Sequence, residues 1–259
     1  MRALELTARW PVPNVAAAVV LPDGSVATAG DCSRHYRVAS ITKMLVGWAH
    51  LVAAEEGTLA LDTSVGQQGC TVRHLLAHAG GYGFDGAEPI ARPGQRRIYS
   101  NTGIEIATAA LADAAEMPFA DYFREAVLAP LAMTASTLPG SAAHSLRSTV
   151  DDLVRFVGEL TAPQLVSEAS AQAYRSVQFP GLPGLVPGVG RYQDCAWGLG
   201  TEVRAEKQPH WTGTRNSPAT FGHFGGSGTF LWVDPAAGLA LACLTDRPFG
   251  AWAGKPWPA

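Results

Sequence analysis

The sequence predicts an α+β fold in which both ends of the chain form one central antiparallel sheet flanked by helices, with a helical half inserted between them. Strand-like patterns lie in residues 1–38 and 195–250, whereas residues 39–194 are rich in alanine and favour helices. Leu239–Leu244 is apolar at every position, as expected of a central strand that is covered on both faces. We therefore expect a single domain over residues 1–259.

The first expected element is a β-hairpin. Val15–Val20 and Ser25–Ala29 flank LPDG, which is a turn sequence. The residues before the hairpin do not have the form of a signal peptide, because the apolar run begins only after Pro11 and Pro13. Without a secretion signal, we expect a cytoplasmic protein whose four widely spaced cysteines stay reduced.

Helices are expected through the middle of the chain. Gly57 and Gly80 provide stop signals for the first two, and Thr149 can cap the last. The predicted helices are Ile41–Glu56, Val72–Ala79, Thr102–Ala115, Pro118–Leu128 and Val150–Leu160. Residues 177–194 (VQFPGLPGLVPGVGRYQD) contain too much proline and glycine for a regular element and are expected to form a loop.

Strands return after this loop and complete the sheet. The last two are joined by the turn sequence DPAAG. The predicted late strands are Gly198–Val203, Thr220–Phe224, Thr229–Val233 and Leu239–Thr245.

The composition indicates a small-molecule partner. The chain has 47% hydrophobic and 16% charged residues, as an ordinary globular protein has. Its net charge of −3 provides no basic field for nucleic acid or an anionic membrane. No run approaches the length of about 18 apolar residues that would span a bilayer.

Ser40 and Lys43 form the first candidate site. Three residues apart at a helix start, they can share one face, and the Ser40 N–H is left free by the helix. A hydroxyl beside an amine, with a free backbone donor for an oxyanion, suits a nucleophile. The alternative is a capping serine and a lysine whose stem packs against the helix. Lysine is scarce in this chain, and only lysine, not arginine, can lose its proton to act as a base.

Two further segments contain candidate residues. Tyr99 in RIYSNTG offers a phenol for proton transfer, and Asn101 offers an amide; a buried tyrosine and a helix-start asparagine are the alternative. In FGHFGGSGTF, His223 could transfer a proton or bind an anion. Gly225 and Gly226 bring the backbone close to a neighbour and can offer an N–H, although a glycine-rich bulge explains them equally well.

In this order, Ser-x-x-Lys, Tyr-x-Asn and His-x-Gly resemble the serine β-lactamase and penicillin-binding-protein superfamily, and most of all its class C-like branch of β-lactamases, DD-peptidases and esterases. The segments TVRHLLAHAGGYG, WGLG and FGHFGGSG are also similar to this family, so the resemblance covers nearly the whole chain. It implies a β-lactamase/transpeptidase-like fold.

The resemblance also implies roles. Ser40 would be the acyl-accepting nucleophile, and Lys43 and Tyr99 would share its proton and pass one to the leaving group. Asn101 would bind substrate or steady Lys43. The N–H groups of Ser40 and Gly226 would form the oxyanion hole, with His223 on the opposite wall. Lys43 would then face the nucleophile and the tyrosine rather than water.

Other kinds of site are less well supported. His74 and His78 are four residues apart, but Leu75 stands where a zinc HExxH motif needs glutamate, so we expect no metal. We also expect no cofactor. No G-x-S-x-G occurs, which excludes an α/β-hydrolase elbow.

One departure from the family bears on the substrate. Phe224 stands where relatives that bind a substrate carboxylate often have a threonine hydroxyl, although Ser227, Thr229 or an arginine could compensate. The leading hypothesis is a serine hydrolase of small, largely apolar esters or amides, most of all an esterase. A weak β-lactamase or DD-peptidase-like enzyme and a non-catalytic ligand-binding homologue are the alternatives.

Overall fold

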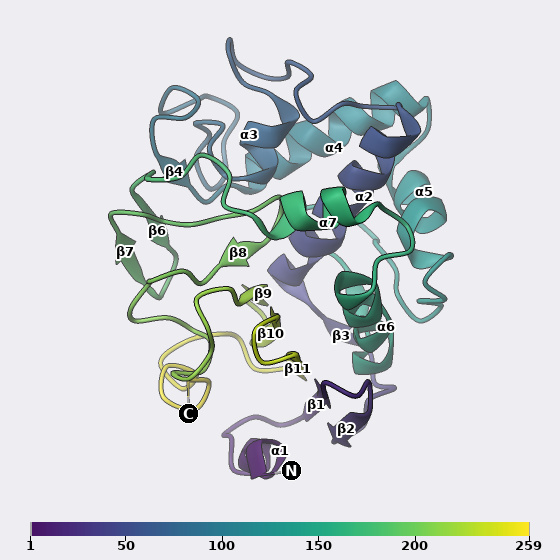
Figure 1. Cartoon of the computed structure of the whole chain (residues 1–259), viewed down its shortest axis with the longest axis vertical. Coiled ribbons are helices and arrows are strands. Elements are labelled where there is room, and N and C mark those ends of the chain that lie inside the picture. Colours follow the sequence, from purple (N-terminus) through teal and green to yellow (C-terminus); the bar gives the residue numbers. More distant parts are fainter. Residues whose placement is uncertain (1, 259) are drawn as a thin grey trace.

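The computed structural model describes residues 2–258 and confirms the α+β arrangement (Figure 1). Its largest sheet has six strands in the order β2-β1-β11-β10-β9-β8. The paired strands are antiparallel, and β1 from the start of the chain pairs with β11 from its end, with Val15 opposite Thr245. The strands of this sheet are β1 (Val15–Val20), β2 (Val26–Ala29), β8 (Glu202–Val203), β9 (Phe221–Gly225), β10 (Thr229–Asp234) and β11 (Leu239–Thr245).

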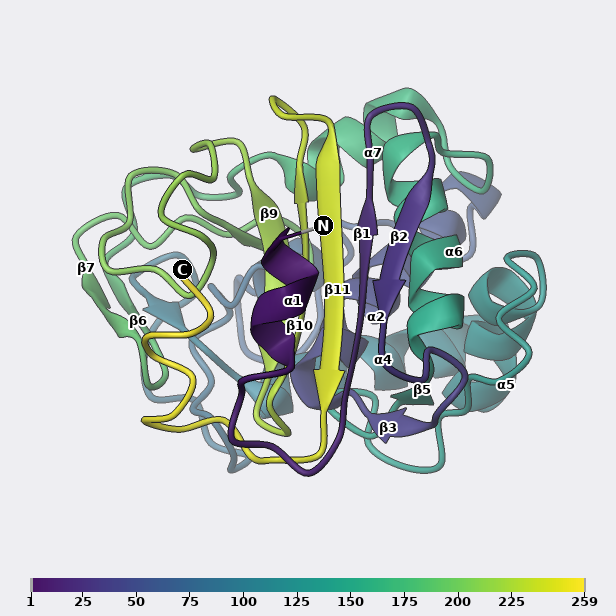
Figure 2. The same ribbon diagram turned by 90° about the horizontal axis from the view of Figure 1, so that it is seen from below.

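Both faces of the sheet are covered, as the apolar pattern of β11 predicted. Ala242 and Leu244 belong to the large apolar core on the helical side, whereas Cys243 packs in a second cluster on the other side. Helix α1 and the C-terminal segment, which includes Trp257, cover that second face (Figure 2).

The helical half contains the predicted helices, with some changed bounds. The helices of this half are α2 (Thr42–Glu56), α3 (Val72–Leu76), α4 (Asn101–Ala115), α5 (Phe119–Phe123), α6 (Val150–Thr161) and α7 (Glu168–Arg175), while α1 (Arg2–Thr7) lies on the other face of the sheet. The predicted helix over Pro118–Leu128 is divided into α5 and a π-helical segment, Arg124–Leu128. The helix from Val72 ends early because its last turn gives way to His78, whose φ is 55°. Helices α1 and α7 were not predicted.

Short strands lie outside the main sheet. β3 (Tyr36–Arg37) pairs with β5 (Arg147–Ser148). Residues 177–194 are not only a loop, as expected, because they contain the antiparallel strands β6 (Gly184–Val186) and β7 (Gly190–Tyr192). β6 also pairs in parallel with β4 (Arg97–Ile98), so a distant strand orders this segment.

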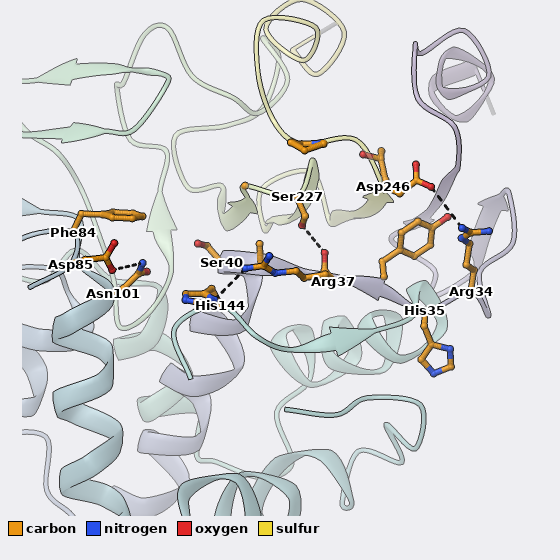
Figure 3. Close-up of a pocket in the computed structure, with 15 residues that line it drawn as sticks. Arg34, His35, Arg37, Ser40, Phe84, Asp85, Asn101, His144, Ser227 and Asp246 are labelled. Carbon is orange, nitrogen blue, oxygen red and sulfur yellow. Dashed lines mark hydrogen bonds and ion pairs between the residues drawn. The ribbon is translucent and has the colours of Figure 1, made fainter. Parts of the chain in front are cut away.

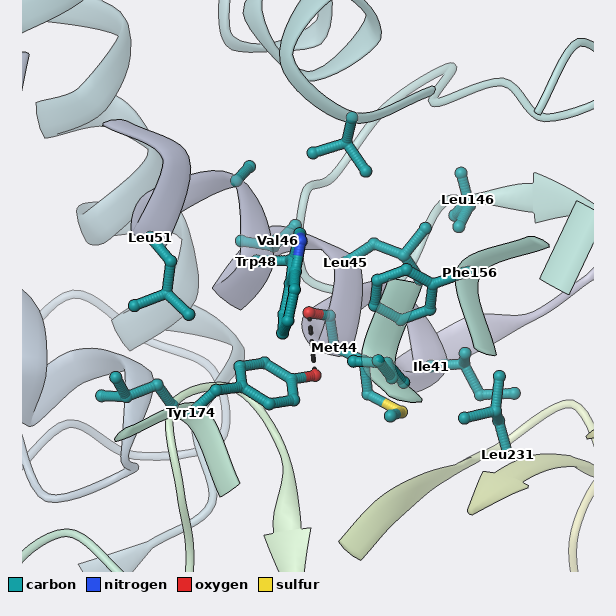
Figure 4. Packing of buried hydrophobic residues seen from close by; sticks show 14 of the residues in the cluster. Ile41, Met44, Leu45, Val46, Trp48, Leu51, Leu146, Phe156, Tyr174 and Leu231 are labelled. Carbon is teal, nitrogen blue, oxygen red and sulfur yellow. Dashed lines mark hydrogen bonds between the residues drawn. The ribbon is translucent and has the colours of Figure 1, made fainter. Parts of the chain in front are cut away.

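Helix α2 lies in the centre of the core and fixes the position of the site. Its residues Thr42 to Ala53 are all buried, and Figure 4 shows Trp48 between Tyr174 and Phe156, edge-on to both rings. The Tyr174 hydroxyl donates to the Met44 carbonyl (3.1 Å). Gly47 lets the helix approach the turn between Trp197 and β8, because an added Cβ would overlap the Leu199 carbonyl. The predicted stop is confirmed, since Gly57 ends the helix with a φ of 80°.

No helix within residues 2–258 is both long and apolar enough to cross a bilayer. All four cysteines lie in this range, and none forms a disulfide.

Candidate active site

Ser40 lies in a pocket of about 630 Å³ where the helical half meets the sheet (Figure 3). It occupies the middle of a 3-10 turn, Ala39–Ile41, directly before α2. Ala39 has a φ of 48°, an uncommon conformation for a residue with a side chain. Such backbone strain is retained where the surrounding structure enforces it, and often at functional sites. Asn101 and Gly226 line the same pocket, so three of the predicted residues meet there.

Lys43 lies one helical turn after Ser40 along the chain, and its side chain is fully buried. Its Nζ is 3.3 Å from Ser40 Oγ and donates to Asn101 Oδ1 (2.8 Å) and to the Ala143 carbonyl (2.9 Å). Burial lowers the pKa of Lys43 from 10.5 to about 7, although the charges of Glu105 and Asp85 oppose the shift. A substantial fraction of Lys43 can therefore be a neutral amine at neutral pH.

Asn101 is the first residue of α4, and its orientation is set from two sides. Its Nδ2 donates to Asp85 Oδ1 (3.2 Å), which leaves Oδ1 facing Lys43. The preceding Ser100 caps the helix by accepting from the Gly103 N–H (2.8 Å). Asn101 is thus placed to hold the Lys43 amine against Ser40.

Tyr99 lies next to this pair. Lys43 Nζ is 4.7 Å from the centre of the Tyr99 ring, and the phenol oxygen is 3.4 Å from His223 Nε2. Burial raises the pKa of Tyr99, while the Ser40 hydroxyl acts in the opposite direction. The phenol therefore stays protonated at neutral pH, which favours Lys43 as the base and Tyr99 as a proton donor.

His223 was expected on the pocket wall opposite Ser40, but it does not line the pocket. It is 2% exposed and lies behind Tyr99, with Nε2 3.4 Å from the phenol oxygen. Its Nδ1 donates to the Phe224 carbonyl (2.6 Å), so Nε2 is the nitrogen that can accept from Tyr99. Burial lowers the pKa of His223 to about 3, and the ring is neutral. It can orient Tyr99, and it does not line the Ser40 pocket.

The two glycines after His223 have different surroundings. Gly225 packs against the turn before α2, where an added Cβ would overlap the Val38 carbonyl, so its role is close packing. Gly226 lines the pocket, and the Phe249 N–H fixes its carbonyl (3.0 Å). The two predicted oxyanion donors, at Ser40 and Gly226, thus lie on the same pocket.

Several residues of the site were not predicted from the sequence. Asp85 and the Ala143 carbonyl complete the surroundings of Asn101 and Lys43. The Ala143 N–H in turn donates to Glu105 of α4 (3.2 Å). None of the three has a local sequence signal, since chain segments far apart bring them together.

A buried charged cluster explains the segment around His210 and Trp211, which had no expected role. Glu202 accepts from Lys207 (2.7 Å), His210 (3.2 Å) and the indole of Trp211 (2.7 Å). Desolvation alone would raise the pKa of Glu202, but the charges of Lys207 and His210 hold it well below its usual range. The cluster therefore satisfies its own charges inside the protein.

Among residues 2–258, no group of three or more His, Cys, Asp or Glu side chains is arranged to hold a metal ion. His74 is one of the two histidines whose spacing resembles a zinc motif. Its ring instead stacks on Phe179, with 4.2 Å between the ring centres.

A sheet made from both chain ends, with a serine and a buried lysine at the start of the central helix, defines the class of serine β-lactamases and their relatives. The β-lactamase family model matches residues 7–257, and the chain belongs to this family. It is therefore a serine hydrolase of the β-lactamase family.

Solved structures agree with this assignment. A β-lactamase from Mycobacterium bovis is 49% identical, with a TM-score of 0.97 over 99% of this chain and 95% of that one. A D-stereospecific amidohydrolase from Streptomyces sp. (21% identical, TM-score 0.73, covering 98% and 94%) shares the fold. So does EstCE1, a hydrolase with promiscuous acyltransferase activity (16% identical, TM-score 0.77, covering 98% and 94%). Among proteins with curated descriptions, none matches this sequence.

Proposed function

We propose that the protein hydrolyses small, largely apolar esters or amides through an acyl intermediate on Ser40, with esters preferred. The observation that carries the proposal is the buried Lys43, whose Nζ is 3.3 Å from Ser40 Oγ and whose pKa is lowered to about 7. An amine that is neutral near the working pH and touches the hydroxyl is the base that a serine nucleophile needs.

The proposed first step forms the acyl-enzyme. Ser40 Oγ attacks the substrate carbonyl carbon while its proton passes to Lys43 Nζ. The N–H groups of Ser40 and Gly226 stabilise the negative charge that develops on the carbonyl oxygen. The bond to the leaving group then breaks, and the leaving oxygen or nitrogen takes a proton from Tyr99, which Lys43 replenishes. Water attacks the acyl-enzyme in the second half by the reverse route.

A second pocket beside Tyr99 supports an apolar substrate. Phe84, Ile90 and Leu185 are among the large apolar side chains that stay exposed, and all three line a pocket of about 620 Å³ together with Tyr99. Phe84 also lines the Ser40 pocket, so the two pockets adjoin. Exposed apolar side chains gathered beside a reactive group are typical of a binding site for an apolar group.

The surroundings of Phe224 favour an esterase over a β-lactamase. Its ring packs against Phe249 and Trp257, with ring centres 4.7 and 6.1 Å away. This position therefore lacks the hydroxyl with which a threonine could bind the carboxylate of a β-lactam. The alternative, a weak β-lactamase or DD-peptidase-like enzyme, is favoured by the relative from Mycobacterium bovis, which is described as a β-lactamase.

The test is the intact mass of the protein after it is mixed with 4-nitrophenyl butyrate or, in parallel, with a penicillin. We expect a butyryl adduct or a burst of nitrophenol on the wild type and neither on Ser40→Ala. Stronger trapping by the penicillin would favour the alternative enzyme. A failure of both reagents to react would refute the acyl-serine mechanism for these substrates and favour a ligand-binding homologue.

A further inference from the structure

We infer that Glu105, on α4, is a positioning residue for the proposed base: its carboxylate holds the turn at residues 141–145 so that the Ala143 carbonyl meets the Lys43 amine. The inference rests on the proposed function and adds to the same site a residue that does not itself line the Ser40 pocket. Two hydrogen bonds connect Glu105 to the base, one from the Ala143 N–H to Glu105 (3.2 Å) and one from Lys43 to the Ala143 carbonyl (2.9 Å).

The turn at residues 141–145 depends on Glu105 for two of its hydrogen bonds. Glu105 Oε1 accepts from the Ser141 hydroxyl and from the Ala143 N–H, and Ser141 Oγ also accepts from that N–H (3.1 Å). Ala143 is fully buried, so water cannot replace the carboxylate as its acceptor. Fixing the Ala143 N–H therefore restricts the carbonyl of the same residue, which belongs to the next peptide unit along the chain.

The same turn borders the reaction site. Its His144 lines the Ser40 pocket (Figure 3). Directly after the turn, the Leu146 N–H donates to Thr42 Oγ1 at the start of α2 (3.2 Å). Glu105 on one side and Thr42 on the other thus hold the turn against the N-terminal end of α2.

The Ala143 carbonyl matters because of the hydrogen-bonding capacity of an amine. A neutral amine has two N–H donors and one lone pair, whereas a carbonyl or amide oxygen can only accept. Asn101 Oδ1 (2.8 Å) and the Ala143 carbonyl (2.9 Å) can take both N–H donors of Lys43. The lone pair is then left for Ser40 Oγ, at 3.3 Å, which is the one of these three neighbours with a proton to give. Without the carbonyl, the amine would be free to turn an N–H towards Ser40 and lose its alignment as a base.

The charge of Glu105 also acts on Lys43. Burial lowers the pKa of Lys43 to about 7, and of the two charges that oppose this shift Glu105 contributes more than Asp85. Other titratable side chains near the amine are kept uncharged at neutral pH by burial: Tyr99, His78 and His223. Removing the negative charge of Glu105 therefore makes the ammonium less favourable and moves its titration to lower pH.

The test compares pH profiles of kcat/KM for 4-nitrophenyl butyrate, a quantity that covers every step up to acylation. Glu105→Gln can still accept both hydrogen bonds but has no charge, and Glu105→Ala has neither property. Glu116→Gln removes an equal charge from the exposed C-terminal end of the same helix and is the control. Each profile is measured between roughly pH 5 and pH 9 and corrected for the uncatalysed rate, and urea unfolding checks that each variant is folded.

Glu105→Ala should lower the plateau of kcat/KM at high pH by about tenfold or more, because the amine loses its alignment. Glu105→Gln should restore most of this loss. Both variants should move the midpoint of the profile from near pH 7 to lower pH, whereas a merely structural defect would lower the plateau and leave the midpoint in place. Glu116→Gln should match the wild type in plateau and midpoint.

The outcomes separate the inference from the proposed function. If the wild type hydrolyses the ester, the inference alone is overturned by an unchanged plateau in Glu105→Ala, or by a midpoint that stays or rises in Glu105→Gln. Should Glu105→Ala fail to fold, the midpoint of Glu105→Gln decides. If the wild type neither forms an acyl-enzyme nor hydrolyses the ester, the proposed function fails, and the inference with it.

Discussion

Replacing Lys43 by methionine should change how the stability of the protein depends on pH. The lysine is fully buried, and its pKa falls from 10.5 to about 7 on folding. Between these values the unfolded chain binds more protons than the folded one, so stability rises with pH. The penalty of the buried charge is fully present below pH 7 and disappears above the unfolded value of 10.5.

The magnitude follows from the same two pKa values. Linkage predicts that Lys43 alone raises the free energy of unfolding by about 3 kcal/mol between roughly pH 6 and pH 9. Lys43→Met lacks this contribution. It also leaves Asn101 Oδ1 and the Ala143 carbonyl without their donor, at about 1–3 kcal/mol each. The prediction therefore concerns the slope with pH and not the absolute stability of the variant.

The assay is urea unfolding of the wild type and Lys43→Met at several pH values over this range. Subtracting the two curves cancels the contribution of every other titrating group that the substitution leaves unchanged. The rate of acylation by 4-nitrophenyl butyrate should rise through the same midpoint, near pH 7, because the neutral amine is the proposed base. Parallel stability curves would show that Lys43 keeps an ordinary pKa, and the reasoning about its role as base would fail.

Three further predictions concern other parts of the molecule. Tyr99→Phe should lower kcat for ester hydrolysis by about 10²–10⁴-fold while urea unfolding changes little, and an unchanged kcat would exclude the phenol from proton transfer. Glu202→Gln should lower the free energy of unfolding by about 3–5 kcal/mol, because it leaves the ammonium of Lys207 buried without its carboxylate; a loss below 1 kcal/mol would mean that the cluster is not closely coupled. Gly47→Ala should destabilise by about 1–3 kcal/mol, although alanine favours helices, because its Cβ overlaps a backbone carbonyl; Gly158→Ala, in open space on α6, is the control and should stabilise slightly.

The sheet could be predicted from the sequence because its strands are strongly patterned. β11 is almost wholly apolar and lies in the interior of the sheet, and β1 matches its predicted bounds, Val15–Val20. Helix α7 could not be predicted in this way. Only Ala171 and Tyr174 of its eight residues are buried, so it lacks a clear apolar stripe.

Long-range pairing explains the segment that was wrongly expected to be only a loop. Proline and glycine dominate residues 177–194, but Gly184 pairs with Arg97 of β4. Arg97 itself is buried and donates to the carbonyls of Cys195 (2.8 Å) and Gln178 (2.8 Å). Local composition contains no information about such a partner.

In the candidate site, too, local contacts could be predicted from the sequence, whereas long-range contacts could not. Ser40 and Lys43 could be predicted as neighbours because one helical turn connects them. The placement of His223 behind Tyr99, rather than on the pocket wall, depends on which face of β9 meets which loop. The contact between Lys43 and the Ala143 carbonyl involves a backbone group, for which residue identity gives no signal.

The pairing of β1 with β11 has a consequence for biosynthesis. The hairpin of β1 and β2 leaves the ribosome long before β11, so the edge of β1 that β11 will occupy must wait until Thr245 has been made. During that interval the hairpin presents an open strand edge, which is prone to pairing with other chains. Gly226, which directly follows β9, is also made late, so a nascent chain with a complete Ser40 helix still lacks this proposed oxyanion donor. The proposed catalysis would therefore begin only after Gly226 has emerged, and chains that end before β9 are expected to be both inactive and prone to aggregate.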